Sequence, residues 1–448
     1  MPSPRERPTP AKGRLEQMFR ALRHRNFKLF VWGQSLSLVG TWLQMVALTW
    51  LVYRLTGSAL MLGIVGFSGQ LPMFVVTPFA GVFADRWDRH KTLLLTQSMA
   101  LVQALVLSVL VFAHAIGIWP IIVLSVLLGI INAFDMPIRQ AFVSDMIEGH
   151  TEDLGNAIAL NSSMVNAARL VGPSIAGILI ATAGEGWCFL VNSASFAAVV
   201  VSLLKMKIEA GPRRVRAVRI FRELGEGFSY TFRFPPIRYM ILLLAAVSLV
   251  GTSMTLLAPV FAKKYLMGGA HTYGFLIGAF GSGALLGAMY LLNKKSVLGM
   301  GRLIAGAVAA FGAGMVAFSF SRTLWLSLPL MLVSGAGMML HIASTNTLLQ
   351  TISETGKRGR VMSFYAMAFR GMSPFGSLIA GALGSWLGAP AALALSGSTC
   401  LAGSILFARK LPAIRPLVRP IYESLGILPQ VARGVQNGSD TPAKEIVG

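Results

Sequence analysis

The chain has 448 residues, of which 54% are hydrophobic and 12% are charged. Soluble domains carry about 25% charged residues, so this composition excludes an ordinary water-soluble protein. On a soluble protein the formal net charge of +22 would indicate a nucleic-acid partner. Here the charges stand in clusters between long apolar runs, without the interleaved aromatic residues of a single-strand-binding surface. We therefore expect a membrane protein and no nucleic-acid partner.

Residues 1–28 are polar and basic, and we expect them to form a cytoplasmic N-terminal tail. No short apolar core with a small-residue cleavage site follows, so we expect no cleaved signal peptide. A helix needs about 20 apolar residues to cross the hydrocarbon core, and the longest apolar runs divide at the turn signals 117–120 and 388–390. The twelve predicted spans are residues 29–53, 58–84, 92–114, 119–141, 155–181, 187–204, 239–262, 271–293, 303–320, 324–349, 358–384 and 390–408.

The longest internal connection, residues 205–238, separates six predicted spans from six. The predicted fold class is therefore an all-α polytopic membrane protein with twelve transmembrane helices in two six-helix pseudo-symmetric halves, 29–204 and 239–408. Apolar residues recur at helical spacing within the connection and predict an amphipathic helix on the inner membrane surface, with a simple tether as the alternative. They are Ile220, Phe221, Leu224, Phe228 and Phe232. We expect the proline-containing cytoplasmic tail 409–448 to be loosely ordered.

Lys and Arg residues predict the orientation, because cytoplasmic loops carry an excess of them. Most of the 39 fall in the two tails and in loops on the same side as the tails, and few fall in the loops of the other side. We therefore expect both termini in the cytoplasm, with the chain in the inner membrane of a bacterial cell. Four tryptophans fall at predicted outer helix ends, as in an aromatic belt: Trp119, Trp187, Trp325 and Trp386.

The two halves share a short sequence pattern. Its members in the first half recur at one fixed spacing in the second: Asp153, Gly155, Arg169 and Pro173 correspond to Glu354, Gly356, Arg370 and Pro374. Both sets lie where the fourth span of a half ends and the fifth begins. Repeated halves with a site between them are a common transporter design, so the pattern favours a transporter.

The loop between the second and third spans carries closely spaced charges after a small residue. Gly81 lets two helices approach closely, and Asp85 at a helix end can accept hydrogen bonds. The set resembles the loop signature of the major facilitator superfamily, Gly-x-x-x-Asp-Arg-x-Gly-Arg-Lys, with departures at Asp88 and His90. A merely solvated charge run is the alternative. The residues of this set are Gly81, Asp85, Arg86 and Arg89, which match the signature, and Lys91, which follows the departure at His90.

Further stretches, 132–143 and 156–177, resemble the subgroup of the enterobactin exporter and similar efflux carriers. Gly172, Pro173 and Gly177 are also similar to the helix-packing motif in the fifth helix of drug/proton antiporters. By this resemblance, the charged loop is a cytoplasmic latch that joins the halves when the carrier faces outward. The equivalent loop of the second half, 293–302, keeps basic residues but has no Asp. The Arg found early in the fourth helix of many proton-coupled members is absent from this sequence.

Two arginines fall inside predicted spans at matching depths. Arg169 lies roughly 21 Å along its helix at 1.5 Å per residue, near the middle of the membrane, and Arg370 occupies the corresponding place in the second half. A charge there costs at least about 2.5–3.5 kcal/mol, so such residues usually face a wet cavity or a partner. One hypothesis is that both arginines bind an anionic substrate, since guanidinium binds carboxylates and phenolates in a fork. The alternative is that each ties together polar groups of the bundle.

Asp135 is the carboxylate that we find within a predicted span, four residues before Arg139 on one helix face. The two can pair, and a local ion pair supporting the inner gate is one interpretation. A proton-coupled carrier also needs a titratable group, so Asp135 with Arg139 is the candidate for coupling. His341 is the second candidate, with a hydrogen-bonded packing role as its alternative.

Other polar side chains within the spans are candidates for lining the substrate path, although some will join helices instead. They are Gln34, Gln44, Asn161, Asn166, Thr252, Ser253, Ser344, Thr345 and Asn346. The 22 Met and 26 Phe residues supply adaptable apolar walls, which suit a bulky amphipathic substrate.

We expect a secondary active exporter that moves a medium-sized, anionic, siderophore-like or drug-like compound by alternating access, with protons as the candidate coupling ion. The alternatives are a lysolipid or lipid flippase or a solute importer of the same fold, and a membrane-embedded sensor or enzyme. No nucleotide-binding loop, metal-ligand spacing or nucleophile–base set is present in the sequence, so we expect no enzyme activity and no cofactor or metal. The expected partners are a small-molecule substrate and the lipid bilayer, and by resemblance the protein is a monomer.

Overall fold

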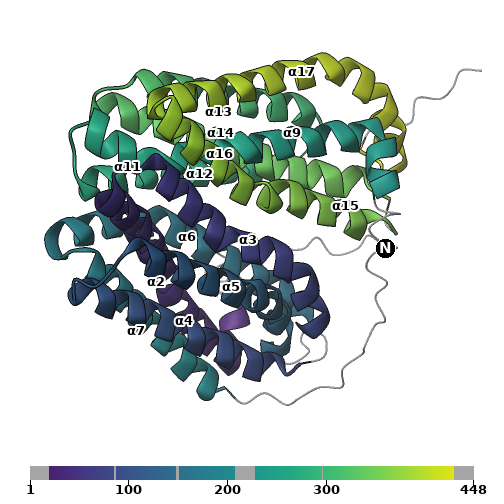
Figure 1. Ribbon diagram of the computed structural model, residues 1–448. Coiled ribbons are helices and arrows are strands. Elements are labelled where there is room, and N and C mark those ends of the chain that lie inside the picture. Colours follow the sequence, from purple (N-terminus) through teal and green to yellow (C-terminus); the bar gives the residue numbers. More distant parts are fainter. Residues whose placement is uncertain are drawn as a thin grey trace, which may run out of the picture.

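The computed structural model describes residues 20–84, 87–147, 151–206, 228–294, 296–354 and 356–427, and the regular elements in these ranges are helices. Figure 1 shows them in two bundles. The first holds η1 (Arg20–Arg23), α2 (Arg25–Thr56), α3 (Ala59–Ala84), α4 (Arg89–Phe112), α5 (Ile118–Met146), α6 (Thr151–Ala183) and α7 (Glu185–Leu204). The second holds α9 (Pro235–Gly251), α10 (Ser253–Leu256), α11 (Ala258–Val260), η2 (Phe261–Tyr265), α12 (Ala270–Asn293), α13 (Met300–Phe320), α14 (Leu324–Ile352), α15 (Arg358–Ala366), η3 (Met367–Gly371), α16 (Ser373–Trp386) and α17 (Ala389–Ser424).

Eleven helical stretches of the described residues are long and apolar enough to cross a membrane. One of them, Pro235–Tyr265, contains α9, α10, α11 and η2. The predicted fold class is confirmed as an all-helical membrane protein with about twelve helices. Most observed helices begin and end within a few residues of the predicted bounds; the second-half helix predicted from residue 303, for example, is α13 and begins at Met300.

The predicted eleventh span, 358–384, differs because it is interrupted. Helix α15 gives way to the π-helical turn η3, and α16 then begins with Pro374 in its first turn. Proline has no N–H, and its ring clashes with the carbonyl of the residue four positions earlier, which is Arg370. The backbone therefore widens at Arg370, and single π-helical turns of this kind occur frequently at functional sites.

Each bundle packs around its own interior, and the two bundles meet along two helix pairs. In the first bundle α3 packs on α5, and α7 packs on α2 and α4; in the second, α12 and α13 both pack on α14, and α13 packs on α17. Between the bundles, α3 lies against α16 and α6 lies against α12. The domain boundaries proposed from the sequence stay predictions.

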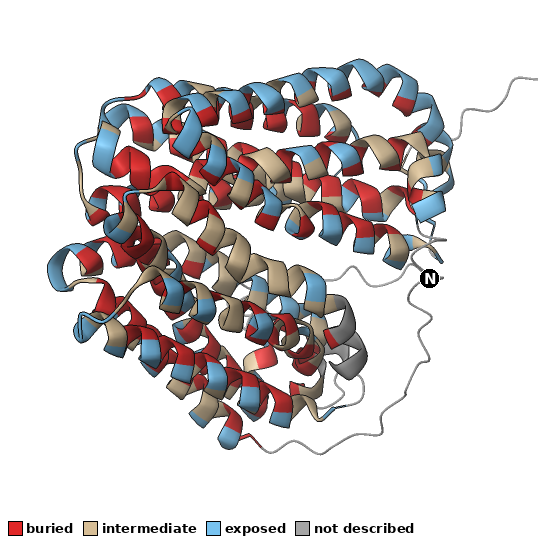
Figure 2. Cartoon of the chain, viewed as in Figure 1, coloured by how far each residue is buried: buried red, intermediate tan, exposed pale blue. Residues whose placement is uncertain are grey.

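The distribution of buried and exposed residues is the one expected of a membrane protein, with apolar side chains on the outer surface. Figure 2 shows buried residues facing the interior of each bundle and exposed residues along its outer ridges. Many exposed residues are large and apolar, including Leu292, Phe320 and Leu406. The four belt tryptophans of the sequence prediction are also exposed. A bilayer solvates such side chains, whereas backbone polar groups must bond internally, as they do in helices.

The expectation of a loose tail after residue 408 was wrong for residues 409–424. Helix α17 continues to Ser424 and buries Leu411, Ile414 and Val418 on one side. The prolines at positions 412, 416 and 420 lie four residues apart on exposed positions. The carbonyls that they leave without a helical donor therefore also face outward, where solvent can bond them.

The central connection is described only at its end, where residues 228–233 are helical. The rings of Phe228 and Phe232 pack at a tilt, with centroids 4.4 Å apart, and both lie near Phe364 of α15. This part of the predicted amphipathic helix thus packs on protein. Its other predicted apolar residues, Ile220, Phe221 and Leu224, lie outside the described residues.

Candidate substrate site between the two bundles

Arg169 and Arg370 come from different bundles, and their positive charges interact. Arg169 belongs to α6 and Arg370 to η3, and the positive charge of Arg370 is within interaction range of Arg169. The Nη1 atom of Arg370 also lies 2.6 Å from Sδ of Met136 in α5. Although Arg370 lies in the middle of the predicted eleventh span, its side chain is exposed. Because that side chain extends toward the first bundle, we place its exposed surface between the bundles.

The two crossings between the bundles begin at glycine pairs near the predicted outer helix ends. A Cβ on Gly177 of α6 would lie 2.7 Å from Cα of Gly274 in α12. A Cβ on Gly381 of α16 would lie equally close, at 2.7 Å, to Cα of Gly63 in α3. Such separations need two residues without side chains, so each crossing depends on its glycine pair.

Both crossings extend inward to the two arginines. On one side the carbonyl oxygen of Arg169 faces Gly281 of α12, where a Cβ would lie 2.7 Å from it. Pro173 deprives that carbonyl of its helical donor, which leaves it available to the neighbouring helix. On the other side Gly371, next to Arg370, faces the ring of Phe74 in α3. The contacts between the bundles therefore extend from the predicted outer helix ends to the level of Arg169 and Arg370.

Three residues that sequence reasoning missed belong to this region. Nε2 of Gln70 in α3 donates to Oγ of Ser377 in α16 at 3.2 Å, across the crossing. The Tyr365 phenol donates to the carbonyl of Ile342 at 3.2 Å and interacts with Arg370 and Asn346. A glutamine inside an apolar span was a usable signal for Gln70. Nothing local marks Tyr365, whose hydrogen-bond partner Ile342 lies 23 residues away along the chain.

The other predicted substrate residues divide into two groups. Asn346 lies half-buried beside Tyr365 and accepts a hydrogen bond from Gln350 at 2.5 Å, and Asn161 and Asn166 are half-buried on α6. By contrast, Gln34 and His341 are buried inside their own bundles. His341 Nδ1 lies 3.4 Å from Thr345, and its Nε2 has no hydrogen-bond partner among the described residues.

Some polar residues considered for the path instead join helices within a bundle. Gln44 bonds to Gln103 of α4 at 3.0 Å and accepts from Asn192 of α7 at 2.6 Å. In the second bundle the hydroxyl of Ser253 bonds to that of Ser396 in α17 at 3.0 Å. These side chains form hydrogen bonds between helices of one bundle, so they are not available to bind a substrate.

Asp135 lies in a closed polar cluster near the inner end of α5. Its carboxylate pairs with Arg139 and accepts hydrogen bonds from Thr96 at 3.0 Å and Gln97 at 2.6 Å, both on α4. The side chain is 2% exposed. These contacts join α4 to α5, as expected of a structural ion pair. Because the Asp135 carboxylate is buried between the two helices, a change in its charge would also alter their packing.

The charged loop between α3 and α4 is described from Trp87 onward, and Asp85 and Arg86 lie outside the described residues. Arg89 Nη1 donates to both carboxylate oxygens of Asp145 in α5, at 3.0 and 3.1 Å. Asp88, the departure from the family signature, caps α4 by accepting from the backbone N–H of Lys91 at 3.1 Å. Gly81 lies in the last turns of α3.

At the predicted cytoplasmic ends, each bundle holds the segment that precedes its first span. In the first bundle Asp153 pairs with Arg20 at 2.6 Å and with His24 at 2.9 Å. In the second, the backbone N–H of Glu354 donates to the hydroxyl of Tyr230 at 3.4 Å. The repeated acidic residues thus stand at corresponding structural positions.

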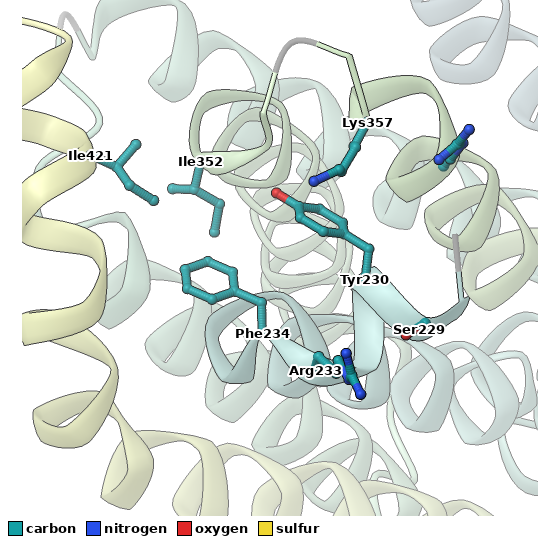
Figure 3. A pocket seen from close by; sticks show the side chains of 8 residues that line it. Ser229, Tyr230, Arg233, Phe234, Ile352, Lys357 and Ile421 are labelled. Carbon is teal, nitrogen blue, oxygen red and sulfur yellow. The ribbon is translucent and has the colours of Figure 1, made fainter. Parts of the chain in front are cut away.

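The second of these junctions borders an open pocket of about 680 Å³. Figure 3 shows Lys357 lying over the ring of Tyr230, 4.8 Å from its centroid, with Arg233 nearby and the apolar wall opposite. Lys357 also donates to Glu354 at 2.7 Å, and this bond raises the pKa of the Lys357 ammonium above its ordinary value. The junction links the central connection to the loop before α15, the helix that leads to Arg370.

Comparisons with known proteins agree with this architecture. The chain is 27% identical to the staphyloferrin A transporter of Staphylococcus aureus over 357 residues, 79% of this chain and 88% of that protein. It is 27% identical to the multidrug efflux pump Tap of Mycolicibacterium fortuitum over 388 residues, 84% of this chain and 93% of that protein. A bacterial homologue of the iron transporter ferroportin, crystallised in an inward-facing state, superposes with a TM-score of 0.60 at 19% identity, covering 85% of this chain and 98% of that one.

The model of the transmembrane secretion effector family matches residues 17–418, which is most of the chain. That family consists of transporters with no enzymatic function. The chain therefore belongs to the transmembrane secretion effectors of the major facilitator superfamily and is a multi-pass secondary transporter of small molecules.

Proposed function

We propose that this transporter exports a medium-sized, anionic organic compound, siderophore-like or drug-like, across the inner membrane of a bacterial cell. Two observations carry the proposal: the charge of Arg370 acts on Arg169 across the bundles, and the Arg370 side chain reaches Met136 of the first bundle. Two like charges in a medium of low dielectric repel strongly, and both are costly at this depth. A substrate that brings one or two negative charges removes that repulsion, and each guanidinium can bind a carboxylate or phenolate in a fork.

The arrangement of the bundles supports transport by alternating access. The two glycine crossings hold the outer halves of α3, α6, α12 and α16 together down to the arginines, as expected of an inward-facing carrier. Export would then load the substrate from the cytoplasm onto the arginines, after which the bundles rock apart on the outer side. The latch proposed from the family signature, Asp85, Arg86, Arg89 and Lys91 with Gly81, would close the inner side in that second state.

Coupling to protons is proposed to run through Asp135 and Arg139. The carboxylate joins α4 to α5, and Met136, its neighbour, contacts Arg370. Protonation of Asp135 would release Arg139 and loosen the connection between α4 and α5 beside the substrate arginine. The names of the relatives, a staphyloferrin A transporter and multidrug efflux pumps, support an organic substrate and outward movement. We propose that the carrier works as a monomer with both termini in the cytoplasm.

The test is to compare the culture medium of a producing strain with and without this protein by untargeted mass spectrometry. We expect at least one anionic compound that leaves the cell only when the intact protein is present. The Arg169→Gln and Arg370→Gln variants, confirmed in the membrane by blotting, should lose that compound from the medium, while Arg415→Gln on the exposed side of α17 should not. A neutral or cationic compound that both arginine variants still export would overturn the proposal. A change confined to membrane lipids would favour the flippase alternative.

A further inference from the structure

A second cavity lies in the second bundle, away from the substrate arginines. It is a groove of about 510 Å³ between α12, α13 and α14, with mostly apolar walls. Its residues on α13 run from Arg302 to Ala310, which extends about 12 Å along the helix. Val333 on α14 and Tyr290 on α12 are exposed at its edges, so the groove opens on the outer surface of the bundle, where lipid lies.

Small residues shape this groove. Gly306 and Ala310 on α13 face Ala336 and Gly337 on α14. A Cβ on Gly337 would lie 2.7 Å from the carbonyl oxygen of Ala307, so the helices touch along their backbones at the base. A Cβ on Gly306 would meet nothing within 4 Å. Gly306 therefore borders open space in the groove.

Two cations stand at the mouth of the groove, at the predicted cytoplasmic end. Lys294 follows the last residue of α12, and Arg302 lies in the first turn of α13. Within the described part of the chain, no hydrogen bond or ion pair engages either side chain. Tyr290 lies one turn above Lys294 and is exposed, as aromatic residues at the membrane interface are.

We propose that this groove binds one anionic phospholipid of the cytoplasmic leaflet. An acyl chain lies along Gly306 and Ala310, and the phosphate lies between Lys294 and Arg302. The charge pattern carries the assignment, because basic sites between helices on the cytoplasmic side attract anionic headgroups. A zwitterionic lipid would match the apolar walls equally well but would leave the two cations without a net counter-charge.

The first test measures lipid retention by native mass spectrometry on the purified full-length protein, with phosphatidylglycerol and phosphatidylcholine offered together. The parent should retain phosphatidylglycerol preferentially. Each cation contributes about five-fold to affinity for an anionic lipid surface, so Lys294→Gln with Arg302→Gln should lower retention about 25-fold. The matched control removes two exposed cations of α17 instead, Arg409→Gln with Arg415→Gln, and should retain the lipid like the parent.

The second test fills the groove without touching its charges. Gly306→Leu should abolish retention of phosphatidylglycerol, whereas Ala402→Leu, at an exposed position of α17, should not; gel filtration confirms that both variants fold. Glycerol 3-phosphate alone should not displace the lipid. The proposal is overturned if phosphatidylcholine is retained equally well, if the α17 control loses the lipid as the groove variant does, or if Gly306→Leu retains it. Displacement by glycerol 3-phosphate would reduce the site to an anion site.

Discussion

Gly177 of α6 and Gly274 of α12 approach so closely that a Cβ on Gly274 would lie 2.6 Å from Cα of Gly177. The same relationship holds between Gly63 and Gly381 on the other side of the molecule. The two pairs are related by the repeat of the halves, and both lie on the predicted outer side of Arg169 and Arg370. The close contact of the bundles on that side therefore depends on four glycines, which have no side chain.

A bulkier residue in one crossing should shift the carrier away from this closed arrangement. Overpacking of a tight contact costs about 1–3 kcal/mol, which is about 5- to 150-fold in a two-state population. For Gly177→Val we expect a loss of transport of at least about ten-fold. A cysteine at Ser174, whose hydroxyl faces Gly278 in the same crossing, should become accessible to an impermeant maleimide from outside. The native Cys188 and Cys400 are buried.

The control for this experiment is Gly155→Val in the same helix, where a Cβ would meet nothing within 4 Å. It introduces the same β-branched residue, with the same effect on helix propensity, but touches no partner. Unchanged maleimide labelling in Gly177→Val, or equal labelling in both variants, would show that the α6–α12 crossing does not control access from outside.

Arg370 should matter for its charge and shape rather than for its contact with Met136. Arg370→Gln removes the charge, and we expect at least a ten-fold loss in transport of an anionic substrate. Arg370→Lys keeps the charge without the planar fork, so it should retain intermediate activity with a raised KM. Met136→Leu is a volume-conserving change that costs less than about 1.5 kcal/mol and should leave transport near the parent level. Vesicle transport assays give kcat and KM for each variant; a Met136→Leu defect as large as that of Arg370→Gln would contradict this assignment.

Much of this architecture could be predicted because one physical quantity, the length of apolar helix needed to cross the bilayer, controls it. The exceptions arise at prolines, because the effect of a proline on a helix depends on the residues packed around it. At Pro374 the helix breaks into a π-helical turn, whereas α6 continues through Pro173 at the repeated position. In α17, three prolines that predicted disorder share one exposed side and are tolerated.

The candidate site was predictable in part. Arg169 and Arg370 could be found because a charge inside an apolar run is costly and therefore conspicuous. Their proximity depends on how two distant helices cross, which the local sequence does not encode. His341 shows the converse: it is equally conspicuous within its span, but it is buried inside the second bundle. The partners of Tyr365, which decide its position, lie in α14 and η3 and could not be read from its neighbours.

A double-mutant cycle on Asp135 and Arg139 tests whether this ion pair is structural or carries the coupling proton. Breaking a buried ion pair from one side costs about 3–5 kcal/mol, because it leaves an uncompensated charge. Arg139→Gln should therefore lower Tm sharply, and Asp135→Asn should do the same. The double variant should be more stable than the sum of the single losses predicts. Thermal unfolding in detergent measures all four proteins.

Transport assays at several pH values complete that experiment. If Asp135 carries the coupling proton, transport by the double variant should no longer depend on an imposed pH gradient, even where its stability is restored. A double variant that is stable and still responds to the gradient as the parent does would assign Asp135 and Arg139 to packing alone and would move the coupling group elsewhere.

Asp88 replaces the glycine of the family signature, and its contacts explain what that replacement does. Its side chain accepts from the backbone N–H of Lys91, and its carbonyl accepts the first helical bond, from Thr92 at 2.8 Å. Loss of an N-cap to alanine costs about 0.5–2 kcal/mol, but loss to glycine costs only a few tenths. Asp88→Ala should therefore lower Tm measurably, while Asp88→Ser and Asp88→Gly should remain close to the parent. If Asp88→Gly is as destabilised as Asp88→Ala, the carboxylate acts through contacts other than the cap, and the family glycine would not be its equivalent in this loop.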